Sequence, residues 1–331
     1  MTSAERLERL LAREELSPAD AREALDFLVA EDSSDVDRAA LLVAWRAKGV
    51  TGGELSGLMD GTAAKMSAVD LGREGLIDTC GTGGGPATLN LSTGAAIVAA
   101  AAGVCVAKHG NRSVSSRVGS ADVIEAWGVP LDDTADQIKA RFDRCGVAFL
   151  FAPAHHGAFR AVGPVRKALG IRTLFNLVGP LTNPARAARR MIGVYSDAFL
   201  DPLADCLRRQ IIEEAYVVFG HDGLDEVSPT AHTTFRHVRN RQVVMGTWEP
   251  ADFGVRPLDP RVYEGSDTAE EAAKRLREAM QGGRGYEALI PNVAVALMLA
   301  GLEKTEKAAG ERARETIRSG RSEDVLEKMR G

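Results

Sequence analysis

The sequence of 331 residues has few cysteines and no long apolar run. Its longest apolar run, residues 94–107, is too short to span a bilayer, so we expect no membrane-spanning helix. Met1 leads directly into a charged amphipathic segment, which predicts that there is no signal peptide. The four cysteines form no CxxC pair and lie far apart among apolar neighbours, which indicates buried free thiols and a reducing, cytoplasmic location: Cys80, Cys105, Cys145 and Cys206.

A large net charge is missing as well. The formal net charge is −5 at pH 7, and charged residues of both signs are spread along most of the chain. Whole-chain attraction to nucleic acid or to an anionic membrane needs a strongly basic surface. We therefore expect neither nucleic acid nor membrane as a partner.

One stretch lacks acidic residues altogether, between Asp143 and Asp197. A solvated basic face is one interpretation of this stretch. Turn residues interrupt it at Gly163-Pro164 and Gly179-Pro180, which favours an anion-facing surface, with Arg166 able to fork a carboxylate or phosphate. The basic residues in it are Arg144, Arg160, Arg166, Lys167, Arg172, Arg186, Arg189 and Arg190.

Residues 1–66 carry the pattern of four short helices. Ser17-Pro18 is a helix start, Gly49 is a helix stop, and Thr51 with Glu54 forms a capping box. A helical module of this size with narrow apolar faces is typical of a packing or dimerisation element rather than of a catalytic one.

From about residue 76, strand-like segments alternate with helical patterns. The segments 76–80, 104–107, 147–151, 191–195 and 215–219 predict strands, and 121–127 and 200–210 predict helices. This alternation predicts an α/β domain with a mostly parallel central sheet flanked by helices, whose ligands bind beyond the carboxyl ends of the strands. After residue 233 we expect a hairpin over 235–248 and helices over 268–280, 292–299 and 308–317.

Two loops rich in small residues follow predicted strands. Gly81-Thr82-Gly83-Gly84-Gly85 offers consecutive backbone N–H groups ahead of a helix start at Ser92-Thr93, which together form an anion cradle. The second loop, residues 108–120, adds the cations Lys108 and Arg112. Two phosphate-type loops so close in sequence predict a ligand with phosphate at both ends.

Asp225 and Glu226 follow the predicted strand 215–219. Adjacent carboxylates beside a phosphate site suit Mg²⁺, although an ordinary exposed turn has the same spacing. The Ser92 hydroxyl has two open roles, as a ligand to metal or phosphate and as the helix cap. His155-His156 is a pocket-lining candidate, whereas the other histidines have no metal-ligand spacing. No nucleophile–base pair for covalent catalysis is apparent.

Seven motifs in a fixed order carry a family resemblance. They are GTGG at 81–84, NLST at 90–93, KHGNRSVSS at 108–116, GSADVIEAWGV at 119–129, FLFAP at 149–153, PVRKALGIRTLFNLVGPLTNPA at 164–185 and GLDEVSPT at 223–230. Over residues 5 to 320 the chain resembles the anthranilate phosphoribosyltransferases of tryptophan biosynthesis. That family joins phosphoribosyl pyrophosphate to the amine of anthranilate and releases pyrophosphate.

The resemblance implies the residues of the site. It places Ser92, Asp225 and Glu226 on Mg²⁺, two ions per active site, and Gly81, Asn111, His156 and Arg166 around anthranilate. The donor-binding residues that it implies are Gly81, Gly84, Gly85, Thr88, Asn90, Leu91, Ser92, Thr93, Lys108, His109, Gly110, Asn111, Arg112, Ser113, Val114, Ser115, Ser116 and Ser120.

The resemblance also implies a cytoplasmic homodimer. Residues 1–70 with about 166–186 would form the helical dimerisation domain, and residues 71–165 with 187–331 the α/β domain that binds the phosphoribosyl donor. Its partners would be the two small-molecule substrates.

The chain departs from the family pattern within its most diagnostic motif. The family usually has Gly-Thr-Gly-Gly-Asp-Gly and one more residue before the asparagine, whereas this chain has Gly85-Pro86-Ala87. The missing aspartate would shift Mg²⁺ handling onto Asp225 and Glu226 or weaken donor binding.

Two alternatives stay open at this point. One is a pyrimidine nucleoside phosphorylase-like enzyme of the same structural superfamily, although residues 81–93 lack that group's lysine- and serine-rich phosphate loop. The other is a non-catalytic paralogue that binds nucleic acid, which the net charge of −5 and the intact Asp225-Glu226 pair disfavour.

Overall fold

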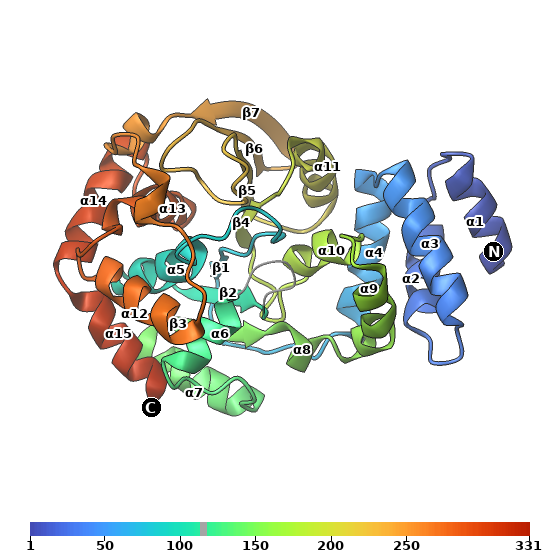
Figure 1. The fold of residues 1–331 in the computed structure, drawn as a ribbon, viewed down its shortest axis with the longest axis horizontal. Helices are drawn as coiled ribbons and strands as arrows, with labels where there is room; N and C mark the ends of the chain where they lie inside the picture. Colours follow the sequence, from blue (N-terminus) through green and yellow to red (C-terminus); the bar gives the residue numbers. More distant parts are fainter. Residues whose placement is uncertain (113–117) are drawn as a thin grey trace.

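The computed structural model describes residues 1–112 and 118–331 of the chain. A helical bundle formed by the N-terminal residues lies at one end of the molecule, and a sheet flanked by helices forms the larger part (Figure 1). In both described ranges, every helix is too short or too polar to cross a lipid bilayer. The predicted fold class, a small helical domain with a larger α/β domain, is confirmed.

The four predicted N-terminal helices are present as α1 (Ser3–Leu11), α2 (Pro18–Val29), α3 (Asp35–Lys48) and α4 (Gly52–Lys65). Their N-cap side chains each accept a backbone N–H of the first turn, including the predicted Ser17 and Thr51 caps. The Glu54 carboxylate is fully buried and accepts hydrogen bonds from Trp45 Nε1 and Lys48 Nζ of α3. The capping box of α4 therefore also holds α3 in place.

The described residues form a seven-stranded sheet in the order β3-β2-β1-β4-β5-β6-β7. The first five strands pair in parallel, and the β6–β7 hairpin is antiparallel, as predicted. The strands are β1 (Ile77–Asp78), β2 (Val106–Gly110), β3 (Val147–Phe151), β4 (Arg189–Gly193), β5 (Glu214–Gly220), β6 (Thr233–Arg239) and β7 (Gln242–Trp248).

The predicted bounds hold for β3, whereas β4 lies two residues earlier than predicted, β5 and β6 are longer, and β1 and β2 differ in ways that affect the site. β1 covers only two residues, and β2 runs on through Lys108, His109 and Gly110, which we expected in a loop. These three residues pair with residues 149–151 of β3. A lysine and a histidine are tolerated in this buried strand because Lys108 Nζ donates to the Thr79 carbonyl and the Ser92 hydroxyl, both at 3.3 Å. The loop after β2 therefore begins at Asn111.

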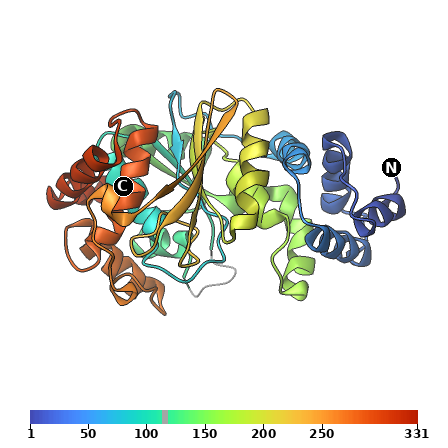
Figure 2. The same ribbon diagram turned by 90° about the horizontal axis from the view of Figure 1, so that it is seen from above.

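Helices cover both faces of the sheet (Figure 2). The predicted helix at 292–299 begins earlier, at Tyr286, and includes Pro291. The helices α7, α8 and α15 were not predicted, and α9 and α10 were expected only in so far as about 166–186 was assigned to the helical domain. The helices after α4 are α5 (Leu91–Ala101), α6 (Ser120–Ala126), α7 (Ala135–Cys145), α8 (Ala152–His155), α9 (Gly163–Leu169), α10 (Phe175–Leu181), α11 (Leu200–Arg209), α12 (Ala269–Met280), α13 (Tyr286–Leu299), α14 (Glu306–Arg318) and α15 (Arg321–Arg330).

Two apolar cores lie on opposite faces of the sheet. Along β4 and β5, alternate residues enter different cores: Met191 and Tyr216 pack with α5, α12 and α13, whereas Ile192 and Val217 pack on the side of α11. The second core is continuous with the N-terminal bundle, and α9 and α10 pack against α3 and α4. All four cysteines are free, Cys145 and Cys206 buried and Cys80 and Cys105 half-buried.

The strand order places a crevice between β1 and β4. From β1 the chain proceeds through β2 and β3 to one side, whereas β4 is followed by β5 on the other side. Connections that leave neighbouring parallel strands in opposite directions open a crevice beyond their carboxyl ends, where ligands of such sheets bind.

Candidate active site

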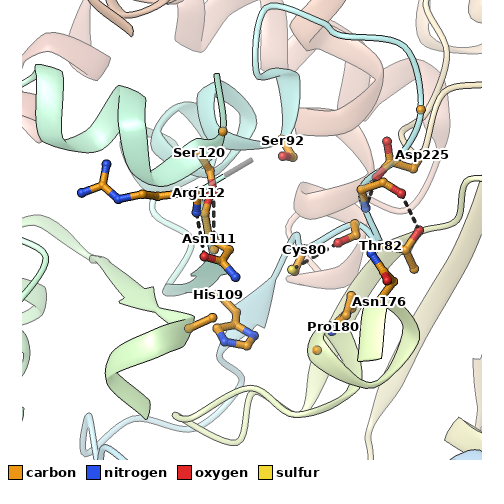
Figure 3. A pocket seen from close by; sticks show the side chains of 18 of the residues that line it. Cys80, Thr82, Ser92, His109, Asn111, Arg112, Ser120, Asn176, Pro180 and Asp225 are labelled. Carbon is orange, nitrogen blue, oxygen red and sulfur yellow. Dashed lines mark hydrogen bonds between the residues drawn. The ribbon is translucent and has the colours of Figure 1, made fainter. Parts of the chain in front are cut away.

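A cavity of about 460 Å³ lies at this crevice. The glycine loop after β1 lines one side of it, and the ends of β2 and β5 with residues from α8 to α10 line the rest. Figure 3 shows Asn111, Arg112 and Ser120 on one side of the cavity, with Thr82 and Asp225 on the opposite side. Both predicted phosphate loops therefore face one space.

The glycine loop is held by backbone contacts to distant segments. Thr82 N–H donates to the Gly193 carbonyl at 2.8 Å, and Gly83 N–H donates to an Asp225 carboxylate oxygen at 2.7 Å. Gly83 and Gly84 have positive φ angles of +67° and +95°, a conformation that glycine adopts without strain. The loop thus turns its backbone towards the cavity.

Position 85 has no room for the family's aspartate in this conformation. A Cβ atom on Gly85 would lie 2.8 Å from the Gly223 carbonyl oxygen and 2.9 Å from an Asp225 carboxylate oxygen. The following residues are fixed as well, because Leu89 N–H donates to Tyr263 and the Ala87 carbonyl accepts from Gly265. The shortened loop is tied down at both ends.

The two predicted acids lie next to this loop and also line the cavity. Glu226 accepts a hydrogen bond from Ser92 N–H at 2.9 Å and one from the Thr88 hydroxyl at 3.2 Å. Burial raises the pKa of Asp225, and burial together with the charge of Asp225 raises the pKa of Glu226 to about 8. Two adjacent carboxylates with raised pKa values mark a place where negative charge is poorly compensated.

The residues present fit Mg²⁺. In the described ranges neither Asp225 nor Glu226 has an ion-pair partner within 4 Å, and no group of three or more His, Cys, Asp or Glu side chains could hold a metal ion. Mg²⁺ typically binds to one or two carboxylates and completes its shell with substrate phosphates and water. A two-carboxylate site beside a hydroxyl and a phosphate loop matches that requirement better than a site enclosed by protein ligands.

On the opposite side, Asn111 and Ser120 are joined by two hydrogen bonds of 3.2 Å. Arg112, however, forms ion pairs with Asp122 and Glu125 of α6 at 2.7 and 2.8 Å, and Figure 3 shows its guanidinium turned away from the cavity. The implied donor residues Ser113, Val114, Ser115 and Ser116 lie outside the described residues.

Three predicted details at the start of α5 need correction. Leu91 and Thr93 are buried and do not line the cavity, so their side chains are not brought to the site. Ser92 is not the helix cap, because Asn90 occupies that position with a φ of +53°. Asn90 makes no side-chain capping bond. Both Asn90 and Ser92 line the cavity.

The other end of the cavity is aromatic and nearly uncharged. The His156 ring lies 5.1 Å from the His109 ring and stacks on Phe159 at 5.3 Å. Burial lowers the pKa of His156 to about 4 and that of His109 well below its ordinary value, so both imidazoles are neutral at pH 7. His109, which the resemblance places at the donor, therefore turns its ring towards the acceptor residue His156.

Arg166 supplies the cation of this end. Its guanidinium lies 5.4 Å from the Phe175 ring centre, and burial lowers its pKa without any acidic partner. A half-buried cation beside neutral rings suits a planar aromatic ligand that carries a carboxylate. Of the predicted anion-facing arginines, Arg160 also lines the cavity, but Arg190 is buried and donates to the carbonyls of Leu181 and Ala187.

Sequence reasoning missed several residues that support the site. Asn176 lines the cavity, and Asn183 donates to the buried Asp78 carboxylate at 2.7 Å. Asn292 exchanges two hydrogen bonds of 2.9 and 3.0 Å with the backbone of Val227, next to Glu226. Asn292 is the one polar residue in the buried run 288–299, and that pattern was a usable signal.

The fold and the site together define an enzyme of the glycosyl-transferring class. Residues 73–323 match the glycosyl transferase family, a/b domain, and residues 4–66 match the glycosyl transferase family, helical bundle domain. These two matches span most of the chain.

More narrowly, the chain belongs to the anthranilate phosphoribosyltransferase family. It is 40% identical over 331 residues to the anthranilate phosphoribosyltransferase of Haloarcula marismortui, with 99% of both chains covered. The crystal structure of the Thermus thermophilus enzyme matches with a TM-score of 0.90 and 35% identity, covering 98% of this chain and 99% of that one. The Saccharomyces cerevisiae enzyme, solved in complex with phosphoribosyl pyrophosphate (PRPP) and Mg, matches with a TM-score of 0.87 and 28% identity, covering 99% and 96%.

Proposed function

We propose that the protein transfers the phosphoribosyl group of PRPP to the amine of anthranilate, with Mg²⁺, and releases pyrophosphate. The observation that carries this proposal is the contrast within one cavity. The glycine loop beside a buried acid pair forms one end, and neutral rings with the half-buried cation Arg166 form the other. A polyanionic donor and an aromatic carboxylate acceptor suit these two ends.

In this proposal the donor binds between the two loops. The described residues that would hold it share a position on the cavity wall and offer N–H, hydroxyl, amide or ammonium donors: Gly81, Gly84, Gly85, Thr88, Asn90, Ser92, Lys108, Gly110, Asn111 and Ser120. Asp225, Glu226 and the Ser92 hydroxyl would hold Mg²⁺, with two ions per site. When bound, Mg²⁺ would neutralise charge on the departing diphosphate.

The reaction we propose is a dissociative displacement without a covalent enzyme intermediate. As the bond from ribose C1 to the diphosphate breaks, positive charge develops on the ribose and negative charge on the diphosphate. Lys108 and the backbone N–H groups of Gly81 and Gly84, which line the cavity, would stabilise that negative charge, whereas the N–H groups of Thr82 and Gly83 already donate to Gly193 and Asp225. A preorganised donor of this type is worth ~3 kcal/mol in an oxyanion site. No nucleophilic side chain is needed.

The acceptor end would orient the amine. Arg166, with Asn111 and Gly81, would bind the anthranilate carboxylate, and the rings of His156 and Phe159 would hold its aromatic ring. Alignment of a weakly nucleophilic amine with the ribose carbon supplies rate by orientation rather than by acid–base chemistry. The neutral imidazoles leave Arg166 as the cation that meets the carboxylate.

We also propose the domain assignment and a cytoplasmic homodimer. Residues 1–70 with about 166–186 form the helical domain in this division, and residues 71–165 with 187–331 the α/β domain. The packing of α9 and α10 against α3 and α4 supports it. Exposed apolar side chains on and beside α1 and α3 support a dimer face there, since Leu11 is 62% exposed and Val36 is 78% exposed. Light scattering would test the dimer, and a monomeric mass would contradict it.

The proposed activity is tested by the loss of anthranilate fluorescence when PRPP and MgCl₂ are added. Consumption should require all three components and should release one pyrophosphate per anthranilate. Phosphorolysis of uridine, assayed in parallel, should be absent. If well-folded protein consumes no anthranilate, the proposal is wrong.

A further inference from the structure

Arg172 is one of several cations of the acid-free stretch whose side chains have no polar partner among the described residues, and it is the one that packs against the glycine loop. Arg172 lies in the connection between α9 and α10 and forms neither an ion pair nor a hydrogen bond there. Its guanidinium carbon lies 4.2 Å from the centre of the Tyr195 ring. The guanidinium is half-buried and stacked on this ring, and the described residues place no acidic side chain within ion-pair distance of it.

The other face of this guanidinium packs on the glycine loop. A Cβ atom on Gly84 would lie 2.9 Å from Arg172 Nε and 3.0 Å from Cζ, so the guanidinium occupies the space that a side chain at position 84 would need. Gly84 lines the cavity but Arg172 does not. Arg172 therefore packs against the loop without itself lining the cavity.

Tyr195 connects Arg172 to the loop a second time. Its backbone N–H donates to the Thr82 hydroxyl at 3.2 Å, and its own hydroxyl accepts from Arg46 of α3 at 3.3 Å. The Tyr195 ring is thus fixed by the loop and by the bundle, and it holds Arg172 against the turn at Gly84. Glycine at position 85 leaves no loop carboxylate that could pair with this cation.

We propose that Arg172 is a positioning residue for the diphosphate end of the donor. It packs against the Gly83-Gly84 turn and places a positive charge beside Gly84, whose backbone lines the cavity where the diphosphate would bind. Arg166, six residues earlier on the same segment, faces the acceptor end, so one segment serves both substrates with two separate guanidinium groups. This inference rests on the proposed function, because it assigns the diphosphate to the same site.

The test compares Arg172→Gln and Arg172→Lys with a control, Arg144→Gln, which removes an exposed arginine at the end of α7. Calorimetry would measure the binding of inorganic pyrophosphate with MgCl₂, and steady-state assays would measure KM for PRPP and for anthranilate. We expect Arg172→Gln to weaken pyrophosphate binding and raise KM for PRPP by about 10- to 100-fold, with KM for anthranilate unchanged. Arg172→Lys should recover part of the loss, and Arg144→Gln should match the wild type.

Three outcomes would overturn the inference. They are wild-type pyrophosphate affinity in Arg172→Gln, an Arg172→Lys variant no better than Arg172→Gln, and equal losses for PRPP and anthranilate. Thermal unfolding of each variant identifies a misfolded protein. Pyrophosphate binding does not depend on turnover, so a wild-type protein that binds pyrophosphate without consuming anthranilate would refute the proposed activity and leave the role of Arg172 testable.

Discussion

The two ends of the cavity are built by different means. At the donor end, backbone and side-chain hydrogen bonds join the glycine loop, Ser92 and the acid pair, although these lie more than 130 residues apart in the sequence. The acceptor end is instead formed by packed aromatic and imidazole rings, with the Arg166 guanidinium against the Phe175 ring. Burial acts on both ends in opposite directions, raising the pKa of Glu226 and lowering that of His156.

The difference shows that burial can leave one end of a cavity with carboxylates that need a cation and the other end with neutral imidazoles. A divalent cation would stabilise the ionised form of these two carboxylates, because it offsets the desolvation that burial imposes and the repulsion between their charges. Imidazoles with lowered pKa values leave Arg166 and the exposed Arg160 as the charged groups of the acceptor end. The donor end should therefore respond strongly to metal and pH, and the acceptor end weakly to both.

Removal of the acid pair should separate the two ends most completely. Asp225→Asn with Glu226→Gln should lower Mg²⁺-dependent turnover by about 1,000-fold or more, because the stabilisation of the leaving diphosphate is lost. Calorimetry should still detect anthranilate, since Arg166 and the rings are untouched. Circular dichroism should show an intact fold. The matched control, Glu264→Gln, removes an exposed carboxylate from the neighbouring segment and should keep wild-type activity; an unchanged rate in the double variant would show that the metal role is misassigned.

Loss of the acceptor cation should have the reverse pattern. Arg166→Ala should raise KM for anthranilate by about 10- to 100-fold, because a buried charge-assisted bond to the carboxylate disappears. KM for PRPP should change little. Arg160→Ala removes an exposed arginine from the same cavity wall and should cost less. Equal effects of Arg166→Ala on both substrates would contradict the division into two ends.

The fold was largely predictable because its signals are local. Helical and strand periodicity, the Ser17 and Thr51 caps and the turn at Asn240-Arg241 all depend on neighbouring residues, and the structure confirms them. The predicted end of β2, at residue 107, was wrong because Lys108 and His109 are polar residues that a local pattern assigns to a loop. Their burial depends on Ser92 and on the facing helices, which no local pattern contains.

The site was predictable as residue types but not as contacts. Glycines, Lys108 and the acid pair stand out in the sequence by their chemistry. The bond from Gly83 to Asp225, the clamp of Asn292 on Val227 and the position of Arg172 against Gly84 arise only when distant segments pack together. The structure also shows why glycine replaces the family's aspartate at position 85. A side chain there would meet Gly223 and Asp225 rather than open space.

Restoration of the family's acid should therefore damage the donor end. Gly85→Asp places a Cβ atom against the Gly223 carbonyl and adds a third carboxylate beside Asp225. We expect about a tenfold rise in KM for PRPP, with KM for anthranilate unchanged, from strain and like-charge repulsion. Gly85→Ala gives the steric part alone and should lie between the two. A Gly85→Asp variant with better PRPP binding would show that the loop can rearrange to the family's usual form.

The smallest expected effect is a difference in pH dependence between the two ends. Glu226 has a pKa of about 8 in the folded, metal-free chain against an ordinary 4.5, so between these pH values the folded state holds a proton that the unfolded chain has lost. Its contribution to stability is therefore lost as pH rises from 4.5 to 8. Mg²⁺ needs the ionised carboxylate, so the rise in Tm caused by MgCl₂ should be larger at pH 8 than at pH 6.

Comparison with Glu226→Gln isolates this carboxyl group. The variant should show a smaller difference between the two pH values in the response of Tm to MgCl₂, because of the two acids only Asp225 is left to titrate. The affinity for anthranilate should stay constant over the same range, since the pKa of His156, at about 4, lies well below it. An equal response of the wild type at pH 6 and pH 8, or an anthranilate affinity that changes between them, would mean that burial does not act on the two ends in opposite directions.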